Sequence, residues 1–450
     1  MTWTIHHGDC LAWLRSLPDS SVDSVVTDPP YGLGKPPPIR DVLRAWLDGE
    51  QYHATGGGFM GRAWDAYVPG PEVWSEICRV LKPGGHAVVF AGQRTADVMA
   101  IALRLGGLEV RDLIGWCYWS GFPKSHDISK GIDRLHGAER EVVGSYMPPR
   151  GDKTFNTAQH QGHREVTGAR GTDRYITAPS TPDAQRWSGF GTALKPAIEP
   201  CWLVRKPLSE PTIARNVLRW GTGGINVDAC RFAYGDRAWV GPGGSTDGQW
   251  DREWAQSGAP MAERWDATTS RAGGPVGRAD LGRWPANLFH CPKASTGERE
   301  CGCDGLPASR GAAITERGEG SVGLDNPRAG AGRTSEGRRN VHPTVKPLIL
   351  MRWIARLITP PGGLVIDPYT GSGTTGIAAV LEGLDFAGAE LNNNDGPPPQ
   401  RFVDIATARI EWWERYGDQA LEVWKASRGA TDEREAAETA GQIGLFGGVR

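Results

Sequence analysis

The chain has 450 residues, and its 50 Lys and Arg against 52 Asp and Glu give a net charge of −2, so a nucleic-acid partner would have to be held by local basic patches. No apolar run reaches the roughly 20 residues that a membrane span needs, and the first residues, "MTWTIHHGDC", lack the basic start and apolar middle of a secretion signal. The eight cysteines follow no regular framework. We therefore expect a cytoplasmic protein without disulfides or membrane contact.

Two regions of the chain predict alternating strands and helices. From residue 1 to about 119, "WTIHH", "VDSVVTD", "GHAVVFAG" and "VRDLIGWCYW" are strand-like, and "CLAWLRSL" and "PEVWSEICRVL" are helical. From about 341 to 425 the order is helix "PLILMRWIARLI", strand "GLVID", helix "TTGIAAVLEG", strand "FAGAEL" and a Trp-rich helix after residue 401. Strands separated by helices indicate a parallel sheet. Each half is small for a sheet of its own, so we expect the halves to complete one another.

The middle of the chain is less regular. "IEPCWLVRKPL" (198–208) reads as an isolated strand between Gly-, Arg- and Pro-rich stretches at about 120–195 and 230–340. Long irregular segments inside an enzyme usually bind something or are disordered.

A small cysteine cluster allows two interpretations. His290 and Cys291 shortly precede Cys301 and Cys303 in "ECGCDG", which could form a zinc site or leave free thiols in a loop. The spacing matches none of the usual paired zinc knuckles, so the sequence favours free thiols and no metal.

The segment "GLVIDPYTGSGTTGIAA" predicts a nucleoside-binding loop. An apolar strand ends at Asp367, a turn contains Gly371 and Gly373, and a helix follows at once, which brings backbone and helix N–H groups close to a ligand. Glu390 ends the next strand about 20 residues later, where a carboxylate can accept both ribose hydroxyls. No Lys precedes the Thr pair, so the lysine with which a P-loop binds a nucleoside triphosphate is missing. The alternative is an ordinary tight turn.

Two motifs in this order resemble those of a known enzyme family. "TDPPYG" (27–32) is similar to the catalytic motif, and "DPYTGSGTT" to the cofactor loop, of S-adenosylmethionine-dependent DNA amino-methyltransferases that modify adenine N6 or cytosine N4. The cofactor loop follows the catalytic motif, as in the permuted beta class. "HPTVKPLILMRWI" (342–354) resembles the helix that flanks the methionine end of the cofactor. "FMGRAWD" (59–65), "SGFPKSHDISKGID" (120–133) and "GTALKPAIEPCWLVRKPL" (191–208) resemble a phage and actinobacterial branch, the last as its antiparallel final strand.

The resemblance implies a fold and a division of the chain. The fold would be a Rossmann-like α/β methyltransferase with a seven-stranded, mostly parallel, circularly permuted sheet and an irregular target-recognition insertion. The implied parts are a catalytic half at 1–119 with the strand at 197–208, insertions at 120–196 and 209–340 for target recognition, a cofactor-binding half at 341–425, and a tail at 426–450.

The same resemblance assigns the cofactor site. S-adenosyl-L-methionine would meet Asp367, Gly371 and Gly373 with its methionine portion and Glu390 with its ribose. Asp9 in "GDC" would contact the adenine amine, and it also fits an N-cap of the following helix. Motif position alone adds Cys10, His342, Lys346, Tyr369 and Thr374.

The catalytic motif would act on the exocyclic amine of a base, which is a poor nucleophile because its lone pair is delocalised into the ring. Asp28 would accept one amine proton and the Pro29 carbonyl a second, while Pro30 restricts the residue before it. Tyr31 would stack on the base, which must leave the duplex to reach the pocket. The alternative is an Asp-Pro turn with a core tyrosine.

We therefore predict a site-specific DNA methyltransferase that methylates a flipped adenine in double-stranded DNA, as restriction-modification enzymes do. Cytosine N4 is the alternative target, but "DPPY" favours adenine because cytosine enzymes of this family more often begin the motif with Ser. RNA or protein-amide methylation, or a non-catalytic DNA-binding protein with a degenerate core, are further alternatives. The protein could act as a monomer or homodimer.

Other contacts follow from short stretches. Lys124, Lys130 and Arg134 would meet phosphates or form solvated surface. The tail segment "QIGLF", with Gln442, Leu445 and Phe446, resembles the peptide by which bacterial proteins bind the sliding clamp.

Overall fold

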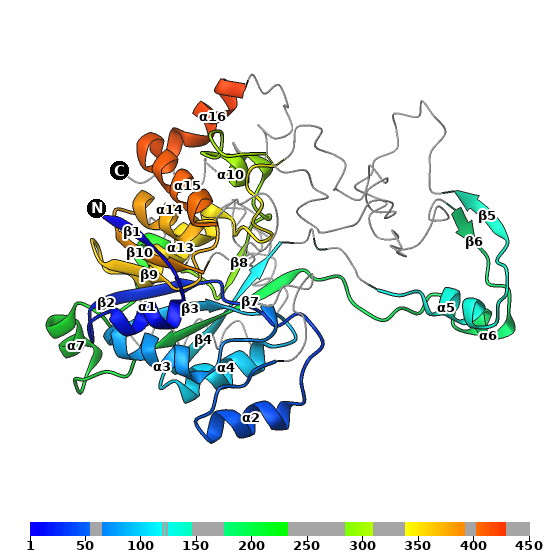
Figure 1. Ribbon diagram of the computed structural model, residues 1–450, viewed down its shortest axis with the longest axis horizontal. Coiled ribbons are helices and arrows are strands. Elements are labelled where there is room, and N and C mark those ends of the chain that lie inside the picture. Colours follow the sequence, from blue (N-terminus) through cyan, green and yellow to red (C-terminus); the bar gives the residue numbers. More distant parts are fainter. Residues whose placement is uncertain are drawn as a thin grey trace, which may run out of the picture. The chain divides into compact units, whose positions relative to one another are not determined.

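The computed structural model describes residues 1–54, 65–118, 121, 125–145, 175–232, 284–308, 338–391 and 402–428. The chain divides into two compact units (Figure 1). Unit 1 contains Met1–Tyr118, Ile198–Thr315 and Glu336–Arg450, and unit 2 contains Trp119–Ala197 and Glu316–Ser335. In the described parts, no helix is long and apolar enough to cross a bilayer.

Unit 1 is built on an eight-stranded, mostly parallel sheet, which confirms the predicted α/β fold. Its strands, in spatial order, are β1 (Trp3–His7), β10 (Asp385–Glu390), β9 (Leu364–Asp367), β2 (Val22–Thr27), β3 (Leu81–Phe90), β7 (Ile198–Arg205), β4 (Glu109–Cys117) and β8 (Leu288–His290). The strand β7 runs antiparallel to both β3 and β4, as expected. The sheet has eight strands instead of the predicted seven because the short β8 pairs in parallel with β4 at the edge.

The two halves of the chain interleave in this sheet, as predicted. Both β9 and β10 come from the C-terminal half and lie between β1 and β2 from the N-terminal half. His7 pairs with Glu390, and Val25 pairs with Ile366, all in parallel register. Neither half could pair these strand edges alone, so they form one sheet.

Helices cover both faces of the sheet (Figure 1). In β2, Val25 and Val26 point to opposite faces, since successive residues of a strand alternate, and each enters a different core. The core around Val25 takes α1 (Cys10–Ser16), α3 (Pro71–Val80) and α4 (Ala96–Leu105). The core around Val26 takes α13 (Leu348–Ile358), α14 (Thr374–Leu381), α15 (Phe402–Tyr416) and α16 (Ala420–Arg428). The predicted helices are present as α1, α3, α13, α14 and α15, whereas α4 was not predicted.

Part of the predicted insertion 209–340 belongs to unit 1. The helix α7 (Ile213–Trp220) contacts β3, and its buried Asn216 donates to the carbonyl oxygens of Pro83 and Thr222 at 2.7 and 2.8 Å. The helix α10 (Thr296–Glu300) contacts α16, and the short η4 (Asp228–Cys230) contacts α13. Irregular sequence therefore supplies packing and an edge strand here, as well as connections. The helix α2 (Ile39–Leu47) was not predicted either.

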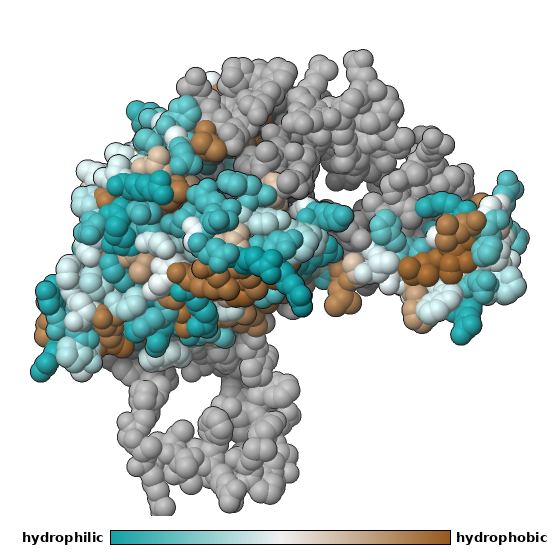
Figure 2. Space-filling view, turned by 60° about the horizontal axis from the view of Figure 1, so that its bottom comes forward, coloured by the Kyte–Doolittle hydropathy of each residue, from teal (hydrophilic) through white to brown (hydrophobic). Residues whose placement is uncertain are grey.

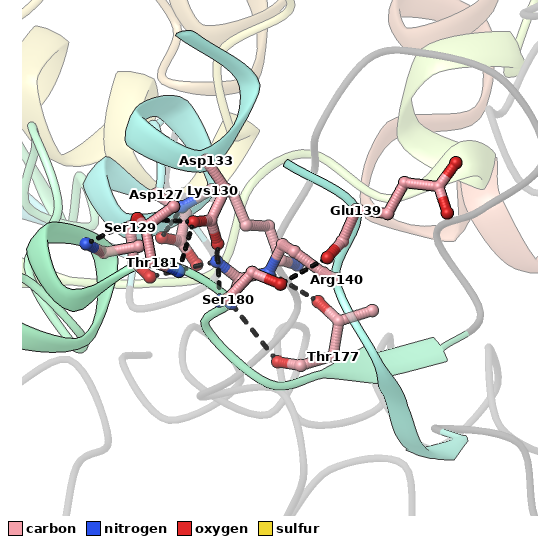
Figure 3. A network of polar contacts seen from close by, with 10 residues as sticks. Asp127, Ser129, Lys130, Asp133, Glu139, Arg140, Thr177, Ser180 and Thr181 are labelled. Carbon is pink, nitrogen blue, oxygen red and sulfur yellow. Dashed lines mark hydrogen bonds and ion pairs between the residues drawn. The ribbon is translucent and has the colours of Figure 1, made fainter. Parts of the chain in front are cut away.

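Unit 2 contains α5 (Ile128–Leu135), a hairpin of β5 (Val142–Ser145) and β6 (Tyr175–Thr177), and α6 (Pro182–Arg186). A buried carboxylate, Asp133, ties these elements together (Figure 3). It accepts hydrogen bonds from the Ser180 and Thr181 backbone amides at 3.1 and 3.0 Å, and its Oδ2 lies 2.6 Å from Arg140 Nη1. Arg140 also reaches the Thr177 hydroxyl at 3.0 Å. A polar network thus replaces part of a hydrophobic core in this small unit.

The surface of unit 2 carries exposed apolar side chains (Figure 2). They are Leu135, Val142, Val143, Ile176, Trp187, Phe190 and Leu194. Of the predicted phosphate-binding residues, Lys130 and Arg134 lie on α5, and Lys124 lies outside the described residues. The tail with Gln442, Leu445 and Phe446 also lies outside them, so clamp binding stays a prediction.

Candidate active site

The predicted site residues meet at one edge of the sheet. Asp28 follows β2, Asp367 ends β9, Glu390 ends β10, and Asp9 follows β1. These four strands are parallel neighbours, so their carboxyl ends lie at the same edge, where open α/β sheets bind ligands. The catalytic and cofactor motifs, more than 300 residues apart in the chain, therefore form one site.

The glycine turn after β9 leaves no room for larger residues. Gly371 and Gly373 have φ angles of 54° and 80°, which L-residues with a side chain rarely adopt. A Cβ atom at Gly371 would lie 2.8 Å from His342 Nε2, and one at Gly373 would lie 2.9 Å from the Ala406 Cα. The Gly371 amide donates to Glu390 Oε2 at 2.7 Å, so the turn and the predicted ribose acid are directly linked.

Asp367 is buried and holds neighbouring elements together. Its Oδ1 accepts from the Thr27 hydroxyl at 2.7 Å and from the Tyr369 amide at 3.0 Å, and its Oδ2 accepts from the Thr375 hydroxyl at 2.6 Å. Burial raises the pKa of the Asp367 carboxyl from 3.8 to about 7, although these hydrogen bonds act in the opposite direction. Its contacts therefore connect β9 to β2 and α14, and its predicted contact with the cofactor stays a prediction.

This pKa predicts a pH-dependent stability. A carboxyl whose pKa is raised on folding contributes stability that is complete below its unfolded value of 3.8 and is lost as the pH rises through about 7. Asparagine does not titrate, so between pH 4 and 8 the free energy of unfolding of Asp367→Asn should rise relative to that of the natural chain, by up to about 4 kcal/mol. Urea unfolding of both proteins at several pH values measures the difference. A difference that stays constant with pH would contradict the raised pKa.

The residues after β1 lie against the cofactor turn. Asp9 is the N-cap of α1 and accepts from the Ala12 amide at 2.9 Å, which confirms the capping interpretation. Burial raises the pKa of the Cys10 thiol to about 11, and that thiol interacts with the Tyr369 hydroxyl. Tyr369 is thus close to Cys10, although 359 residues separate the two in the chain.

The two carboxylate oxygens of Asp28 differ in their partners. Its Oδ2 lies 2.5 Å from the ammonium of Lys346, whose side chain is only 7% exposed. Its Oδ1 is buried and has no hydrogen-bond partner within the described part of the chain. A buried carboxylate oxygen without a partner is costly, so this atom is free to accept a hydrogen bond from a donor placed beside it.

The backbone after Asp28 is held firmly. The Asp65 carboxylate accepts from the amides of Tyr31, Gly32 and Leu33 at 2.8, 3.0 and 3.2 Å. The Thr95 hydroxyl donates to the Tyr31 carbonyl at 2.7 Å. Asp65 ends the segment "FMGRAWD", whose other residues, 59–64, lie outside the described ones. The resemblance singled out this segment, but nothing in the sequence showed which motif Asp65 would hold.

Lys346 joins the catalytic motif to β7. Its ammonium lies 3.5 Å from Glu199 Oε2 and within 5.3 and 5.0 Å of the ring centres of Tyr31 and Phe90. Burial by itself lowers the pKa of Lys346, but the carboxylates of Asp28 and Glu199 outweigh it and raise that pKa. Lys346, predicted to bind cofactor, is therefore a charged partner of Asp28. Glu199 was not predicted at all.

The cofactor turn is supported from behind by a buried arginine. Arg409 of α15 donates to the Ser372 carbonyl, to the Ser372 and Thr374 hydroxyls at 3.0 and 3.3 Å, and to the Glu298 carbonyl at 2.9 Å. The Glu298 carboxylate in turn accepts from the Leu348 amide at 2.8 Å, at the start of α13. Neither residue was predicted, because no local motif marks a support that comes from another element.

We expect Arg409→Met to lower the free energy of unfolding by about 2–4 kcal/mol, because methionine fills a similar volume but leaves buried carbonyls unpaired. Urea unfolding monitored by tryptophan fluorescence measures the change. The control is Arg415→Met, an exposed arginine of the same helix, with an expected loss below about 0.5 kcal/mol. Equal losses in the two variants would contradict a supporting role for Arg409.

The cysteine cluster packs in the core. Cys291, Cys301 and Cys303 are buried free cysteines, and burial raises the pKa of Cys301 and Cys303 to about 12. The Cys301 thiol donates to the Ala420 carbonyl at 3.5 Å. No group of three or more His, Cys, Asp or Glu side chains in the described residues is placed to hold a metal.

A mostly parallel sheet with a glycine turn and an acidic residue at its carboxyl edge is typical of α/β proteins that bind a nucleoside-containing cofactor. The family model N6_N4_Mtase, described as DNA methylase, matches residues 22–154 and 234–395, which is more than half of the chain. The chain belongs to this family of DNA methylases.

Similar proteins were also found individually. The DNA adenine methyltransferase YhdJ of Escherichia coli (strain K12) is 39% identical over 66 residues, which cover 15% of this chain and 22% of YhdJ. The type II methyltransferase M.HpaI of Haemophilus parainfluenzae is 29% identical over 124 residues, 27% of this chain and 34% of M.HpaI. The similarity thus spans about a third or less of these relatives.

Two solved structures cover most of the chain at low similarity. The cytosine-N4-specific PvuII DNA methyltransferase aligns with 91% of this chain and 93% of its own, at 13% identity and a TM-score of 0.40. The structure of TTHA0409 from Thermus thermophilus, complexed with S-adenosyl-L-methionine, covers 91% and 93%, at 16% identity and a TM-score of 0.35.

Proposed function

We propose that this protein transfers a methyl group from S-adenosyl-L-methionine to the exocyclic amine of an adenine flipped out of double-stranded DNA. The observation that carries the proposal is the buried Asp28 Oδ1, which has no partner in the described part of the chain and lies at the same sheet edge as the glycine turn. An exocyclic amine is a donor that satisfies this oxygen. The name of YhdJ, a DNA adenine methyltransferase, supports adenine as the base.

The residues at the sheet edge fit the cofactor. Gly371 and Gly373 allow a close approach to the backbone, and Glu390 would accept from the ribose hydroxyls. Asp9, Cys10 and Tyr369 would surround its adenine end, with His342 and Thr374 flanking the turn. When bound, S-adenosyl-L-methionine supplies an electrophilic methyl carbon whose sulfur leaves with the bonding electron pair.

The chain's own residues would prepare the target amine. Asp28 Oδ1 accepts one amine proton and the Pro29 carbonyl the other, which localises the lone pair on nitrogen. The nitrogen then forms the new bond to carbon and releases one proton at Asp28. Pro30 and the Asp65 hydrogen bonds keep this backbone in place, so the orientation is prepared before the base arrives. Tyr31 stacks on the flipped base and recovers about 1–3 kcal/mol.

The base is identified by incubating the protein with labelled S-adenosylmethionine and unmethylated duplex DNA, followed by digestion to nucleosides. Label in N6-methyladenine is the expected result. Label in N4-methylcytosine would keep the chemistry and change the base. Label only in RNA or protein offered in parallel would overturn DNA as the substrate, and no measurable cofactor binding would overturn the enzyme itself.

Target recognition belongs to this proposal as well. Unit 2 is the best candidate for contacts with DNA, with Arg134 exposed on α5 and Lys130 partly buried on the same helix. The cytoplasmic location stays a prediction of the sequence, which leaves a monomer and a homodimer both open.

A further inference from the structure

A second carboxylate, Glu199, reaches the catalytic motif from the antiparallel strand β7. Its Oε2 accepts from the Tyr31 hydroxyl at 3.3 Å and lies 3.5 Å from Lys346 Nζ. Its Oε1 lies 3.6 Å from Lys293 Nζ. The Glu199 side chain is 17% exposed, so these contacts are largely shielded from water. One side chain thus contacts both the stacking tyrosine and the lysine that pairs with Asp28.

The charges around Asp28 explain why a second carboxylate matters. Lys346 by itself would neutralise Asp28 and make it a weaker acceptor for an amine that becomes positively charged during methylation. Glu199 shares the same buried ammonium, so two carboxylates face one buried lysine. Lys293 is 51% exposed, and water screens its charge. The buried group therefore keeps about one net negative charge beside the amine.

Glu199 also holds the ring of Tyr31 in place through its contact with the Tyr31 hydroxyl. Burial and the nearby carboxylates of Asp28 and Glu199 raise the pKa of Tyr31 well above its usual value, so its hydroxyl stays protonated. That hydroxyl interacts with the Asp28 carboxylate and donates to Glu199 Oε2 at 3.3 Å. The ring is thereby held from its far end, while Asp65 and Thr95 hold its backbone.

We propose that Glu199 is a positioning residue for methyl transfer, which shares Lys346 with Asp28 and thereby keeps Asp28 Oδ1 an effective acceptor for the target amine. This inference rests on the proposed function. In this proposal Glu199 acts through its contacts with Lys346 and Tyr31, and not by touching the base, the cofactor or the reacting atoms.

The test is Glu199→Gln, which keeps the shape and the acceptor oxygen for Tyr31 but removes the charge. We expect the single-turnover rate constant of methyl transfer to DNA to fall about 10- to 100-fold, less than for loss of a group that contacts the reacting atoms. Cofactor affinity by calorimetry and flipping of a 2-aminopurine target by fluorescence should change less than about threefold. The control is Glu109→Gln. Glu109 lies on β4 and pairs with Arg205 of β7, and the rate of this variant should be unchanged.

A coupled variant distinguishes positioning through Lys346 from a merely structural role. In a Lys346→Met background, Glu199→Gln should change the rate less than about threefold, because there is no shared ammonium left. A full loss in that background, an unchanged rate in the natural background, or a parallel loss of cofactor binding and base flipping would each overturn the inference. If the natural protein flips the base and methylates DNA, and Glu199→Gln does so with the same rate constant, only this inference fails. If the natural protein transfers no methyl group to DNA, the proposed function fails and the inference with it.

Discussion

Asp28→Ala is expected to slow single-turnover methyl transfer to DNA by about 10³-fold or more, while the affinity for S-adenosyl-L-methionine changes less than about threefold. The substitution removes the acceptor that draws on the amine proton and the negative charge that stabilises the positive nitrogen, and effects of this kind reach 10²- to 10⁴-fold. Cofactor affinity should be retained because Asp28 lies after β2, whereas the residues proposed to bind the cofactor lie elsewhere. The glycine turn follows β9, and Glu390 is the last residue of β10. Rapid-quench measurement of labelled DNA and calorimetry of cofactor binding give the two quantities.

The control for this experiment is Asp41→Ala, an exposed aspartate in the first turn of α2. Its transfer rate should stay within about twofold of that of the natural chain. A slow rate in both variants would point to a general loss of structure. A normal rate in Asp28→Ala would remove Asp28 from the mechanism and leave its partnerless Oδ1 without a functional explanation.

Gly373→Ala is expected to weaken cofactor binding by at least about 30-fold. A left-handed backbone costs a residue with a side chain about 1–2 kcal/mol, and the added methyl group would lie 2.9 Å from the Ala406 Cα, so the turn must move. A movement of the turn also disturbs the Gly371 amide that donates to Glu390. Calorimetric titration with S-adenosyl-L-methionine measures the loss.

A matched glycine lies at the other end of the same helix. Gly383, after α14, has a φ of 73°, and a Cβ atom there would meet nothing within 4 Å. Gly383→Ala should therefore have the same backbone cost, about 1–2 kcal/mol of stability, with cofactor affinity unchanged. Equal weakening of binding in both alanine variants would attribute the effect to stability alone and contradict a close approach of the ligand at Gly373.

Local patterns predicted the longer strands and most of the longer helices of unit 1, but not its shorter elements. Strands such as "VDSVVT" and helices such as "PLILMRWIARLI" have strong periodicity or continuous apolar runs, and all of them are present. By contrast, β8 has three residues, and α7 and α10 lie in stretches with little periodicity. Such short elements form because the sheet edge and helices beside them offer partners, which a local pattern does not record.

The sequence by itself determined the order of the motifs, the strand ends that carry Asp28, Asp367 and Glu390, and the glycines that the turn requires. These follow from local chemistry, because a strand end, a tight turn and a helix start each depend on a few adjacent residues. Only the tertiary structure decided which residues support them. Lys346 lies 318 residues from Asp28, and Glu199 lies 168 residues from Tyr31. The physical reason is that these contacts depend on the register of β7 and the packing of the two halves into one sheet, and both come from interactions between distant segments.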